Sequence, residues 1–157
     1  MKNIYLNDFN AYEIRIVKFD FQNYLMKKVE VAAAIVMDKG EILCVQRGKN
    51  KFSYISGKFE FPGGKIEEGE TLKETVIREL EEELMLDIVP KEKFLTVEHQ
   101  YPDFHLTMHA FLCSCKNRKL KLTEHIDYKW LEPKDLIRLD WAAADIPIVQ
   151  KLVSDGK

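Results

Sequence analysis

Four glutamates lie within the seven-residue stretch "RELEEEL", which runs from Arg78 to Leu84. The neighbouring residues predict a helix, and the acids fall near its C-terminal end, where the helix dipole disfavours negative charge. No lysine or arginine follows Glu81, Glu82 or Glu83 at the three- or four-residue spacing that would pair with it. A hard divalent cation such as Mg²⁺ or Mn²⁺ would take the carboxylate oxygens and neutralise their repulsion. The cluster therefore predicts a metal site.

Helical geometry separates one of these acids from the other three. At about 100° per residue, Glu79, Glu82 and Glu83 fall within an arc of roughly 100° that borders the apolar face, whereas Glu81 points elsewhere. An ordinary solvated acidic face is the alternative interpretation. The position of the acids at the helix C-terminus, and the lack of basic residues after them, favour the metal site.

The segment before this helix suggests what the metal would act on. "FPGGKIEEGE" contains Gly63, Gly64 and Lys65 shortly before the helix begins. Glycines let backbone N–H groups approach a ligand closely, and a lysine and a helix N-terminus both favour phosphate. Alone, "PGGK" is more often a turn that ends a strand. Together with the acidic stripe, it predicts a phosphate ester or anhydride held by a metal ion.

The elements that must position these residues follow from apolar periodicity and turn signals. Strands are predicted at 29–37, 42–47, 93–100, 104–115 and 127–133, of which 93–100 and 104–115 form a hairpin. Helices are predicted at 72–86 and 145–153, with a helical turn at 135–139. Two helices that cover a mixed sheet make a layered α/β domain.

Both predicted helices carry start signals. Thr71 and Glu74 have the spacing of a capping box at the start of the first helix. Asp145 is a plausible N-cap of the last helix. The buried stripe of the first helix is predicted to contain Leu72, Val76, Leu80 and Leu84, with Ile77 beside them.

Composition limits the possible functions. The 157 residues suggest one domain, with 24 basic and 26 acidic residues and a net charge of −2. This balance argues against a nucleic-acid polymer as the main ligand, which would require a basic surface. The longest apolar run, at 31–37, is too short to span a bilayer, so no membrane association is expected. The N-terminus has no uninterrupted apolar core, so no secretory signal is expected.

Cysteine usage favours a reducing, cytoplasmic location. Cys44, Cys113 and Cys115 are too few and odd in number for a disulfide framework. Cys113 and Cys115 share one face of a predicted strand. Without a second pair of ligands, they are expected to be packed rather than bound to zinc.

Residues 64–86 resemble the signature of the Nudix hydrolases. That signature is a glycine, five residues, a glutamate, seven residues, and then Arg-Glu-aliphatic-x-Glu-Glu-x-Gly-aliphatic. The matching positions are Gly64, Glu70, Arg78, Glu79, Leu80, Glu82, Glu83 and Leu86. One position departs, because Met85 stands where the family has a glycine that closes the helix in the left-handed conformation. We expect the helix to run one or two residues further instead, with the chemistry retained.

The resemblance extends over roughly 28–153. This stretch is similar to the MutT-type branch, which includes 8-oxo-dGTP diphosphatases and CTP pyrophosphohydrolases. It implies an α/β fold, namely a Nudix-type α/β/α sandwich with a mixed sheet. The resemblance assigns 26–157 to the Nudix hydrolase domain, and leaves 1–25 as an N-terminal extension of unknown role.

The resemblance implies a role for each residue of the site. Mg²⁺, with Mn²⁺ as an alternative, would be held by the Gly63 carbonyl, Glu79, Glu82, Glu83 and Glu124. Arg78 would orient Glu79, while Gly64 and Lys65 would contact the phosphate chain. The general base would be Glu79, Glu83 or Glu124.

Three further residues match positions that contact the base in MutT-type enzymes: Arg47, Phe61 and Asp145. Each has an alternative interpretation. Arg47 would form a surface ion pair, Phe61 would pack in the core, and Asp145 would only cap a helix. An ionised Asp145 would accept hydrogen bonds but not donate them.

The resemblance implies Mg²⁺-dependent hydrolysis of oxidised nucleoside triphosphates, such as 8-oxo-dGTP, to a nucleoside monophosphate and pyrophosphate. Hydrolysis of CTP or dCTP is the alternative substrate choice. A regulatory module that binds nucleotides without cleaving them, and a structural domain with a solvated acidic face, are the non-enzymatic alternatives. The protein would be a monomer or a homodimer.

Overall fold

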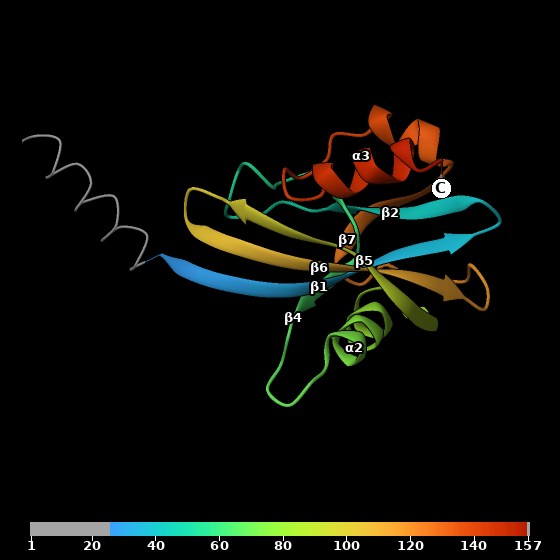
Figure 1. Ribbon diagram of the computed structural model, residues 1–157, viewed down its shortest axis with the longest axis horizontal. Coiled ribbons are helices and arrows are strands. Elements are labelled where there is room, and N and C mark those ends of the chain that lie inside the picture. Colours follow the sequence, from blue (N-terminus) through green and yellow to red (C-terminus); the bar gives the residue numbers. More distant parts are fainter. Residues whose placement is uncertain (1–25, 157) are drawn as a thin grey trace, which may run out of the picture.

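Residues 26–156 are described in the computed structural model, and the predicted extension at 1–25 lies outside them. Figure 1 shows a central sheet with helices on opposite sides. The strands are β1 (Lys27–Asp38), β2 (Glu41–Arg47), β3 (Phe59–Glu60), β4 (Gly63–Lys65), β5 (Ile88–Gln100), β6 (Phe104–Cys115) and β7 (His125–Leu131). The helices are α2 (Leu72–Leu84), the 3-10 helix η2 (Pro133–Arg138) and α3 (Ile146–Ser154).

The sheet is mixed, as predicted. Its seven strands include the path β3-β2-β1-β6-β5, while β4 pairs with β1 and β7 pairs with β2. β1 runs parallel to β6 over eleven residue pairs that begin at Lys27↔Phe104. The other pairings are antiparallel. β1 is therefore the central strand that holds the two halves of the sheet together.

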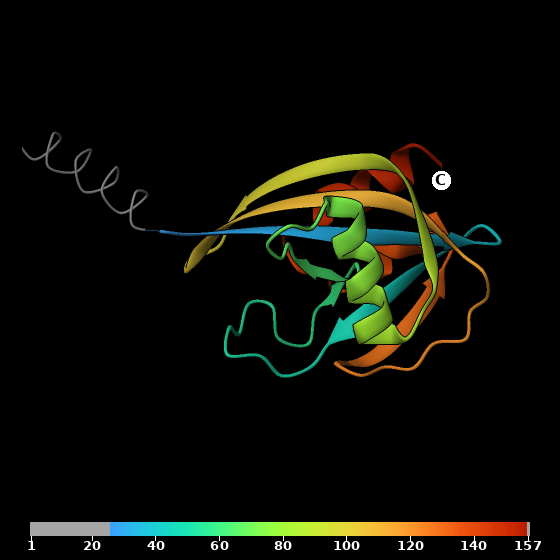
Figure 2. The same ribbon diagram turned by 90° about the horizontal axis from the view of Figure 1, so that it is seen from below.

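Helices cover both faces of β1, which explains its continuous apolar run. Ala32, Ala34 and Val36 belong to the core cluster that packs against α2. Ala33 and Ile35 belong to the cluster on the α3 side. Successive strand residues point to opposite faces, so a strand buried on both faces loses the alternation of polar residues. Figure 2 shows α2 lying across one face of the sheet. This helix completes the predicted α/β/α sandwich.

The start of α2 confirms the predicted capping box. The Thr71 N–H donates to Glu74 Oε2 at 2.8 Å, and the Glu74 N–H donates to Thr71 Oγ1 at 3.3 Å. The apolar stripe is also confirmed, except at Ile77, which is 45% exposed. Thr75, on the other flank of the stripe, is fully buried, and its hydroxyl donates to Glu70 Oε2 at 2.8 Å.

The end of α2 differs from the prediction. The helix stops at Leu84, and Met85 adopts the left-handed conformation with φ 50° and ψ 40°. The Met85 N–H donates to the Glu81 carbonyl at 2.9 Å, which is the bond of an αL cap, and the Leu86 N–H donates to the Leu80 carbonyl at 3.2 Å. Met85 tolerates this position because its side chain is 54% exposed and needs no packing space. The expected continuation of the helix was therefore wrong.

The start of α3 also differs from the prediction. Asp145 has helical dihedrals, and its side chain makes no capping hydrogen bond, so the predicted N-cap role is wrong. The Asp145 side chain instead accepts a hydrogen bond from the backbone of Phe61. A cap needs its side chain near the first helical N–H groups, and this side chain is turned toward β3.

Two other expectations can be compared with the structure. Cys113 is buried and Cys115 is half-buried, and both lie against the α2 cluster as free thiols, so they are packed as predicted. Within residues 26–156, no helix is long and apolar enough to cross a membrane.

Candidate active site

A cavity of about 720 Å³ lies beside β1 and between the two helical layers. Its volume is typical of sites for small molecules. Every site residue predicted from the sequence lines this cavity: Arg47, Phe61, Gly63, Gly64, Lys65, Arg78, Glu79, Glu82, Glu83, Glu124 and Asp145. The fold thus brings together residues from five separate stretches of the chain.

Arg78 organises the acidic residues at one end of the cavity. Its guanidinium donates to both oxygens of Glu70, at 2.6 and 3.0 Å, and to Glu79 Oε1 at 2.9 Å. It also reaches Glu82 Oε2 at 3.2 Å. The hydrogen bonds to Arg78 lower the pKa of Glu70 to about 2. The sequence argument considered only basic residues after the acids, and it missed Arg78, which is adjacent to Glu79 and precedes Glu82 by one helical turn.

Glu83 is the least exposed of the predicted metal ligands, with 7% of its surface accessible. Its Oε2 accepts a hydrogen bond of 3.3 Å from the Gly63 N–H. Burial, with the nearby carboxylates of Glu79, Glu60 and Glu124, raises the pKa of Glu83 to about 7, against an opposing effect of His125. A carboxylate in such surroundings is stabilised by a nearby cation.

Gly63 and Gly64 are required by the close approach of β4 to its neighbours. A Cβ atom on Gly63, whose φ is +150°, would lie 2.1 Å from the Ala32 carbonyl oxygen. A Cβ atom on Gly64 would lie 2.3 Å from the carboxyl carbon of Glu79. The first glycine lets β4 pair with β1, and the second leaves room for the Glu79 carboxylate against the strand.

The donor set at this end of the cavity fits a divalent cation. It consists of carboxylates, which are the ligands of Mg²⁺ and Mn²⁺. Glu79 and Glu82 now face Arg78, and within the described part of the chain no three Asp, Glu, His or Cys side chains are already grouped to hold a metal. The buried, high-pKa carboxyl of Glu83 is the observation that favours a cation here. Binding would require Glu79 and Glu82 to turn from Arg78 toward the ion.

Asp145 and Phe61 lie at the opposite end. Asp145 is 4% exposed, and its Oδ1 accepts from the Phe61 N–H at 2.9 Å. Burial and the charge of Glu60 raise the pKa of Asp145 well above its ordinary value. This shift favours the neutral carboxyl over the ionised form expected from the sequence, and a neutral carboxyl both donates and accepts hydrogen bonds. The Phe61 ring stacks on Trp141 with 4.8 Å between centroids, so its predicted alternative as a core residue is confirmed.

Arg47 forms the ion pair that was its alternative interpretation. Its Nε donates to Glu60 Oε2 at 2.9 Å, and its Nη2 lies 2.8 Å from Glu60 Oε1. Sequence reasoning did not select Glu60, which also lines the cavity. Its place between two buried aromatic residues in "FEFPGG" was the available signal, because strand alternation turns it to the other face.

The apolar wall of the cavity was also missed. It comes mainly from β6 and the turn before it: Tyr101, Phe104, Leu106 and Met108. The Tyr101 hydroxyl accepts from the Ala144 N–H at 3.2 Å, which ties this wall to the segment before α3. Leu106 and Met108 alternate with polar residues along the strand, and that alternation was the signal for a buried face.

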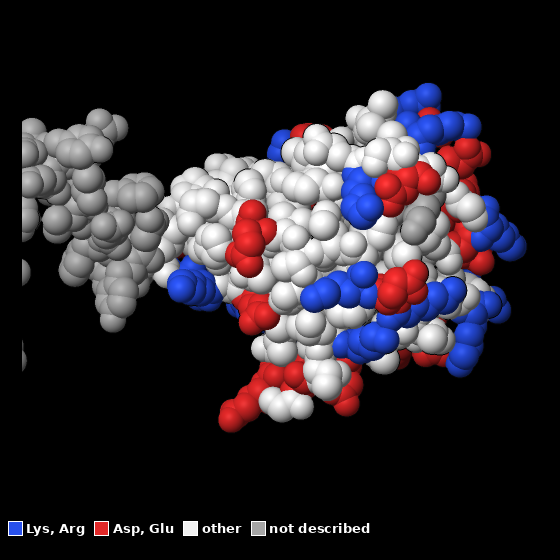
Figure 3. Space-filling model, in the orientation of Figure 1, with Lys and Arg blue, Asp and Glu red and all other residues white. Residues whose placement is uncertain are grey.

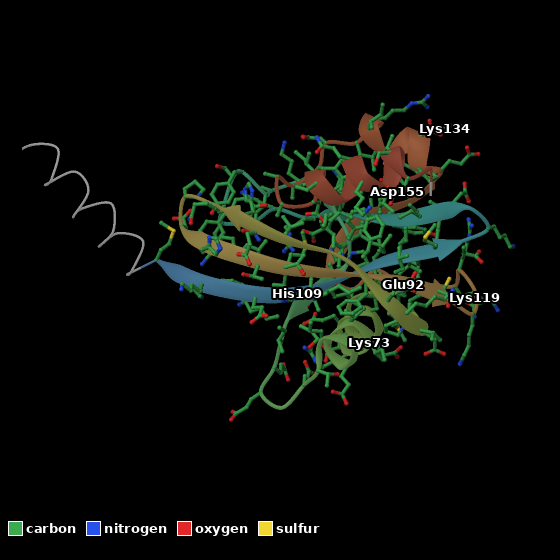
Figure 4. All side chains as sticks on the ribbon, viewed as in Figure 1. Lys73, Glu92, His109, Lys119, Lys134 and Asp155 are labelled. Carbon is green, nitrogen blue, oxygen red and sulfur yellow. The ribbon has the colours of Figure 1, made fainter. Side chains whose placement is uncertain are left out.

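The surface around the cavity has a clear charge pattern. Figure 3 shows acidic atoms gathered along the lower edge, around the segment between β4 and α2. His109, labelled in Figure 4, lies on the sheet outside the cavity and contacts Glu30 at 2.8 Å and Thr96 at 3.0 Å. Glu67, in the segment between β4 and α2, also lines the cavity.

Comparisons with known proteins agree with this geometry. A sequence model of the NUDIX domain matches residues 26–152. An "8-oxo-dGTP diphosphatase" of Proteus vulgaris is 38% identical over 98 residues, which cover 62% of this chain and 85% of the relative. A "CTP pyrophosphohydrolase" of Escherichia coli is 31% identical over 129 residues, covering 82% of this chain and 94% of the relative. The solution structure of the Nudix hydrolase MutT from methicillin-resistant Staphylococcus aureus 252 has a TM-score of 0.66 and 36% identity, and the match covers 84% of this chain and all of that one.

Proposed function

The chain belongs to the Nudix hydrolase family, and we propose that it hydrolyses nucleoside triphosphates to a nucleoside monophosphate and pyrophosphate with a divalent metal ion. As a family member it is an enzyme that cleaves phosphoric anhydrides. The proposal depends above all on one observation, the division of a single cavity into two ends. Carboxylates of α2, with Gly64 and Lys65, line the end on the α2 side of the sheet, and apolar side chains of the α3-side cluster, with Asp145, line the other. The first end suits a metal-bound phosphate chain and the second suits a base.

We propose oxidised purine nucleotides such as 8-oxo-dGTP as the substrate. Asp145 supports this choice, because its raised pKa favours the neutral carboxyl, which is able to donate a hydrogen bond to the base. The Proteus relative named "8-oxo-dGTP diphosphatase" also supports it. CTP or dCTP is the alternative, supported by the Escherichia coli relative named "CTP pyrophosphohydrolase".

The metal ligands in this proposal are the Gly63 carbonyl and four carboxylates, those of Glu79, Glu82, Glu83 and Glu124. A bound Mg²⁺ or Mn²⁺ ion neutralises charge on phosphate oxygens and lowers the pKa of a bound water. Phosphoryl transfer needs this stabilisation and a well-oriented water more than covalent help from the protein.

The remaining side chains bind and orient. Lys65 attracts the phosphate chain, and the backbone of Gly64 approaches it closely because no Cβ intervenes. Arg78 orients Glu79 through its hydrogen bond of 2.9 Å. The general base is Glu79, Glu83 or Glu124, and a pKa of about 7 suits Glu83 for accepting a proton near neutral pH.

The test is pyrophosphate release from a panel of nucleotides, with and without Mg²⁺, by the full chain and its variants. Glu82→Gln and Glu83→Gln each keep the side-chain size and remove one anion, so we expect turnover to fall by orders of magnitude. Glu81→Gln is the matched control, because Glu81 is an exposed acid of the same helix that does not line the cavity. Full activity in both the Glu82 and the Glu83 variants would exclude the metal assignment.

A reducing, cytoplasmic setting and a monomeric or homodimeric state complete the proposal. The free thiols of Cys44, Cys113 and Cys115 support the reducing setting. Burial raises the pKa of Cys44 and Cys113 to about 12, so neither is a reactive thiolate. Sedimentation at micromolar concentration would measure the oligomeric state.

A further inference from the structure

Three charged or ionisable side chains form a hydrogen-bonded network at the wall of the cavity. Glu60 is its centre and is held by Arg47 through one hydrogen bond and one ion-pair contact, as described above. On the other side, His125 Nε2 lies 3.0 Å from Glu60 Oε1. Glu60 can only accept when ionised, so this ring nitrogen carries the hydrogen. The side chain of His125 is 3% exposed and that of Glu60 is 13% exposed, so water competes little for these bonds.

An irregularity in the sheet turns His125 toward this network. β2 and β7 pair residue by residue from Ile42↔Leu131 to Gln46↔Asp127, and then the register shifts so that His125 lies opposite Arg47. In a regular ladder, Ile126 would oppose Arg47, and His125 would point to the other face of the sheet. Ile126 is instead 63% exposed. Such bulges re-aim a single side chain and often lie next to active sites.

Glu60 lies between the two ends of the cavity. Its charge contributes to the raised pKa of Asp145 at the base end and to that of Glu83 at the metal end. The Glu60 carboxylate repels the carboxylates of both Asp145 and Glu83, so its position depends on the groups that donate hydrogen bonds to it. Arg47 supplies one hydrogen bond and one ion-pair contact, and His125 supplies a further hydrogen bond. Loss of the His125 bond loosens Glu60 and, with it, the guanidinium of Arg47.

We propose that His125, which does not line the cavity, is a positioning residue that holds Arg47 at the cavity wall through Glu60 and so sets the affinity for the nucleotide. The proposal rests on the proposed nucleotide substrate. It extends the site to a residue that acts through two others. Because Arg47 matches a position that contacts the base and not the reacting phosphates, its displacement weakens binding in the ground state and the transition state alike. The expected signature is a raised KM with a nearly unchanged kcat.

The decisive variants are His125→Phe, which keeps a ring and removes the N–H, and His125→Gln, whose amide reaches the position of Nε2. Assays at pH 8.5 keep Glu83 ionised, since its pKa is about 7. We expect KM to rise roughly tenfold in His125→Phe, the scale of one lost hydrogen bond to a charged group, and to recover in His125→Gln. Tyr128→Phe is the matched control, because it alters an exposed ring on the same strand.

Two measurements test the network without turnover. Calorimetric binding of the nucleoside monophosphate should weaken by the same factor in His125→Phe. The Arg47 Nε–H signal in a ¹⁵N NMR spectrum, identified through Arg47→Lys, should exchange with water faster than in the wild type. Glu60→Gln, which keeps the shape of the side chain and weakens its hold on Arg47, should reproduce both effects and replaces His125→Phe if that variant does not fold.

The outcomes separate the two proposals. If the wild type releases no pyrophosphate from any nucleoside triphosphate, the proposed function fails, and the Arg47 signal alone decides the role of His125. If His125→Phe loses only thermal stability, with KM, monophosphate affinity and the Arg47 signal unchanged, His125 is merely structural and the inference is overturned. Equal defects in the Phe and Gln variants would overturn it as well.

Discussion

The backbone N–H of Phe61 donates to Oδ1 of Asp145 at 2.9 Å, which joins two residues 84 positions apart in the sequence. This bond connects the wall of the base end to the entry of α3. It occupies the side chain that the sequence had suggested as a helix cap. The acid is consequently buried, and its ionisation is coupled to stability.

Asp145→Asn tests that coupling. The Asn carbonyl still accepts from Phe61, but the side chain no longer titrates. Because the folded pKa of Asp145 lies above its ordinary value of 3.8, its contribution to stability is fully present below pH 3.8 and is lost as the pH rises toward the folded value. We therefore expect Asp145→Asn to melt above the wild type at pH 7, with the difference shrinking toward pH 4 in thermal unfolding.

Asp145→Ala is the control for this prediction. It leaves the Phe61 N–H buried without its acceptor, which costs about 1–3 kcal/mol, so it should melt below the wild type. A higher melting temperature in the Ala variant than in the Asn variant would contradict the role of the hydrogen bond.

Glu83→Gln should stabilise the metal-free protein at alkaline pH. The shift of the Glu83 pKa from 4.5 to about 7 means that its favourable contribution is present below pH 4.5 and is lost as the pH rises through 7. The shift corresponds to roughly 3 kcal/mol at most. Melting curves with a chelator between pH 5 and pH 8 should separate the variant from the wild type only at the upper end. If the melting temperatures of the variant and the wild type differ by the same amount at every pH, burial does not disfavour the ionised form of Glu83.

Gly64→Ala should disable the site without unfolding the protein. The added methyl group would displace the Glu79 carboxylate, which is the mobile end of a side chain. Gly63→Ala is the contrast, because its methyl group would meet the Ala32 backbone at 2.1 Å. We expect the first variant to lose turnover at an unchanged melting temperature, and the second to lose on the order of 3 kcal/mol of stability. An active Gly64→Ala enzyme would show that Glu79 needs no contact with β4.

Met85→Gly should stabilise the protein by about 1 kcal/mol, the cost of a left-handed conformation for a residue with a Cβ. Met85 has a φ of 50° and an exposed side chain, so little packing is lost. Met85→Ala keeps the Cβ and should show no such gain in chemical denaturation. Equal gains for Gly and Ala would exclude backbone strain as the cause.

A chain that begins at Met26 should keep its turnover, because, among residues 26–156, those that line the cavity run from Val29 to Asp145. Kinetic assays would measure this, and gel filtration would compare the oligomeric state with that of the full chain. Loss of turnover in a truncated protein that is still folded would assign residues 1–25 a direct part in the site.

Features set by local periodicity could be predicted from the sequence. The side on which Glu79, Glu82 and Glu83 lie follows from 3.6 residues per turn, and the capping box follows from the three-residue spacing of Thr71 and Glu74. These features depend only on neighbours within one turn. The burial of β1 on both faces follows equally from its unbroken apolar run.

Local rules were insufficient where two outcomes satisfied the same pattern. A residue in the position of Met85 either extends a helix or closes it, and the choice depends on the Leu86 contact with Leu80 and on free space around the side chain. Asp145 either caps a helix or accepts a distant N–H, and the approach of β3 decides between them.

The sequence by itself determined the family signature, the acidic stripe and the helix that presents it, because each is a short-range pattern. Only the tertiary structure decided that Arg47, Glu60 and His125 form one network, since they come from three strands and meet through a shift in register. It also decided the direction in which the pKa values of Glu83 and Asp145 are shifted. A pKa depends on burial and on charges from distant segments, and neither is present in the order of the residues.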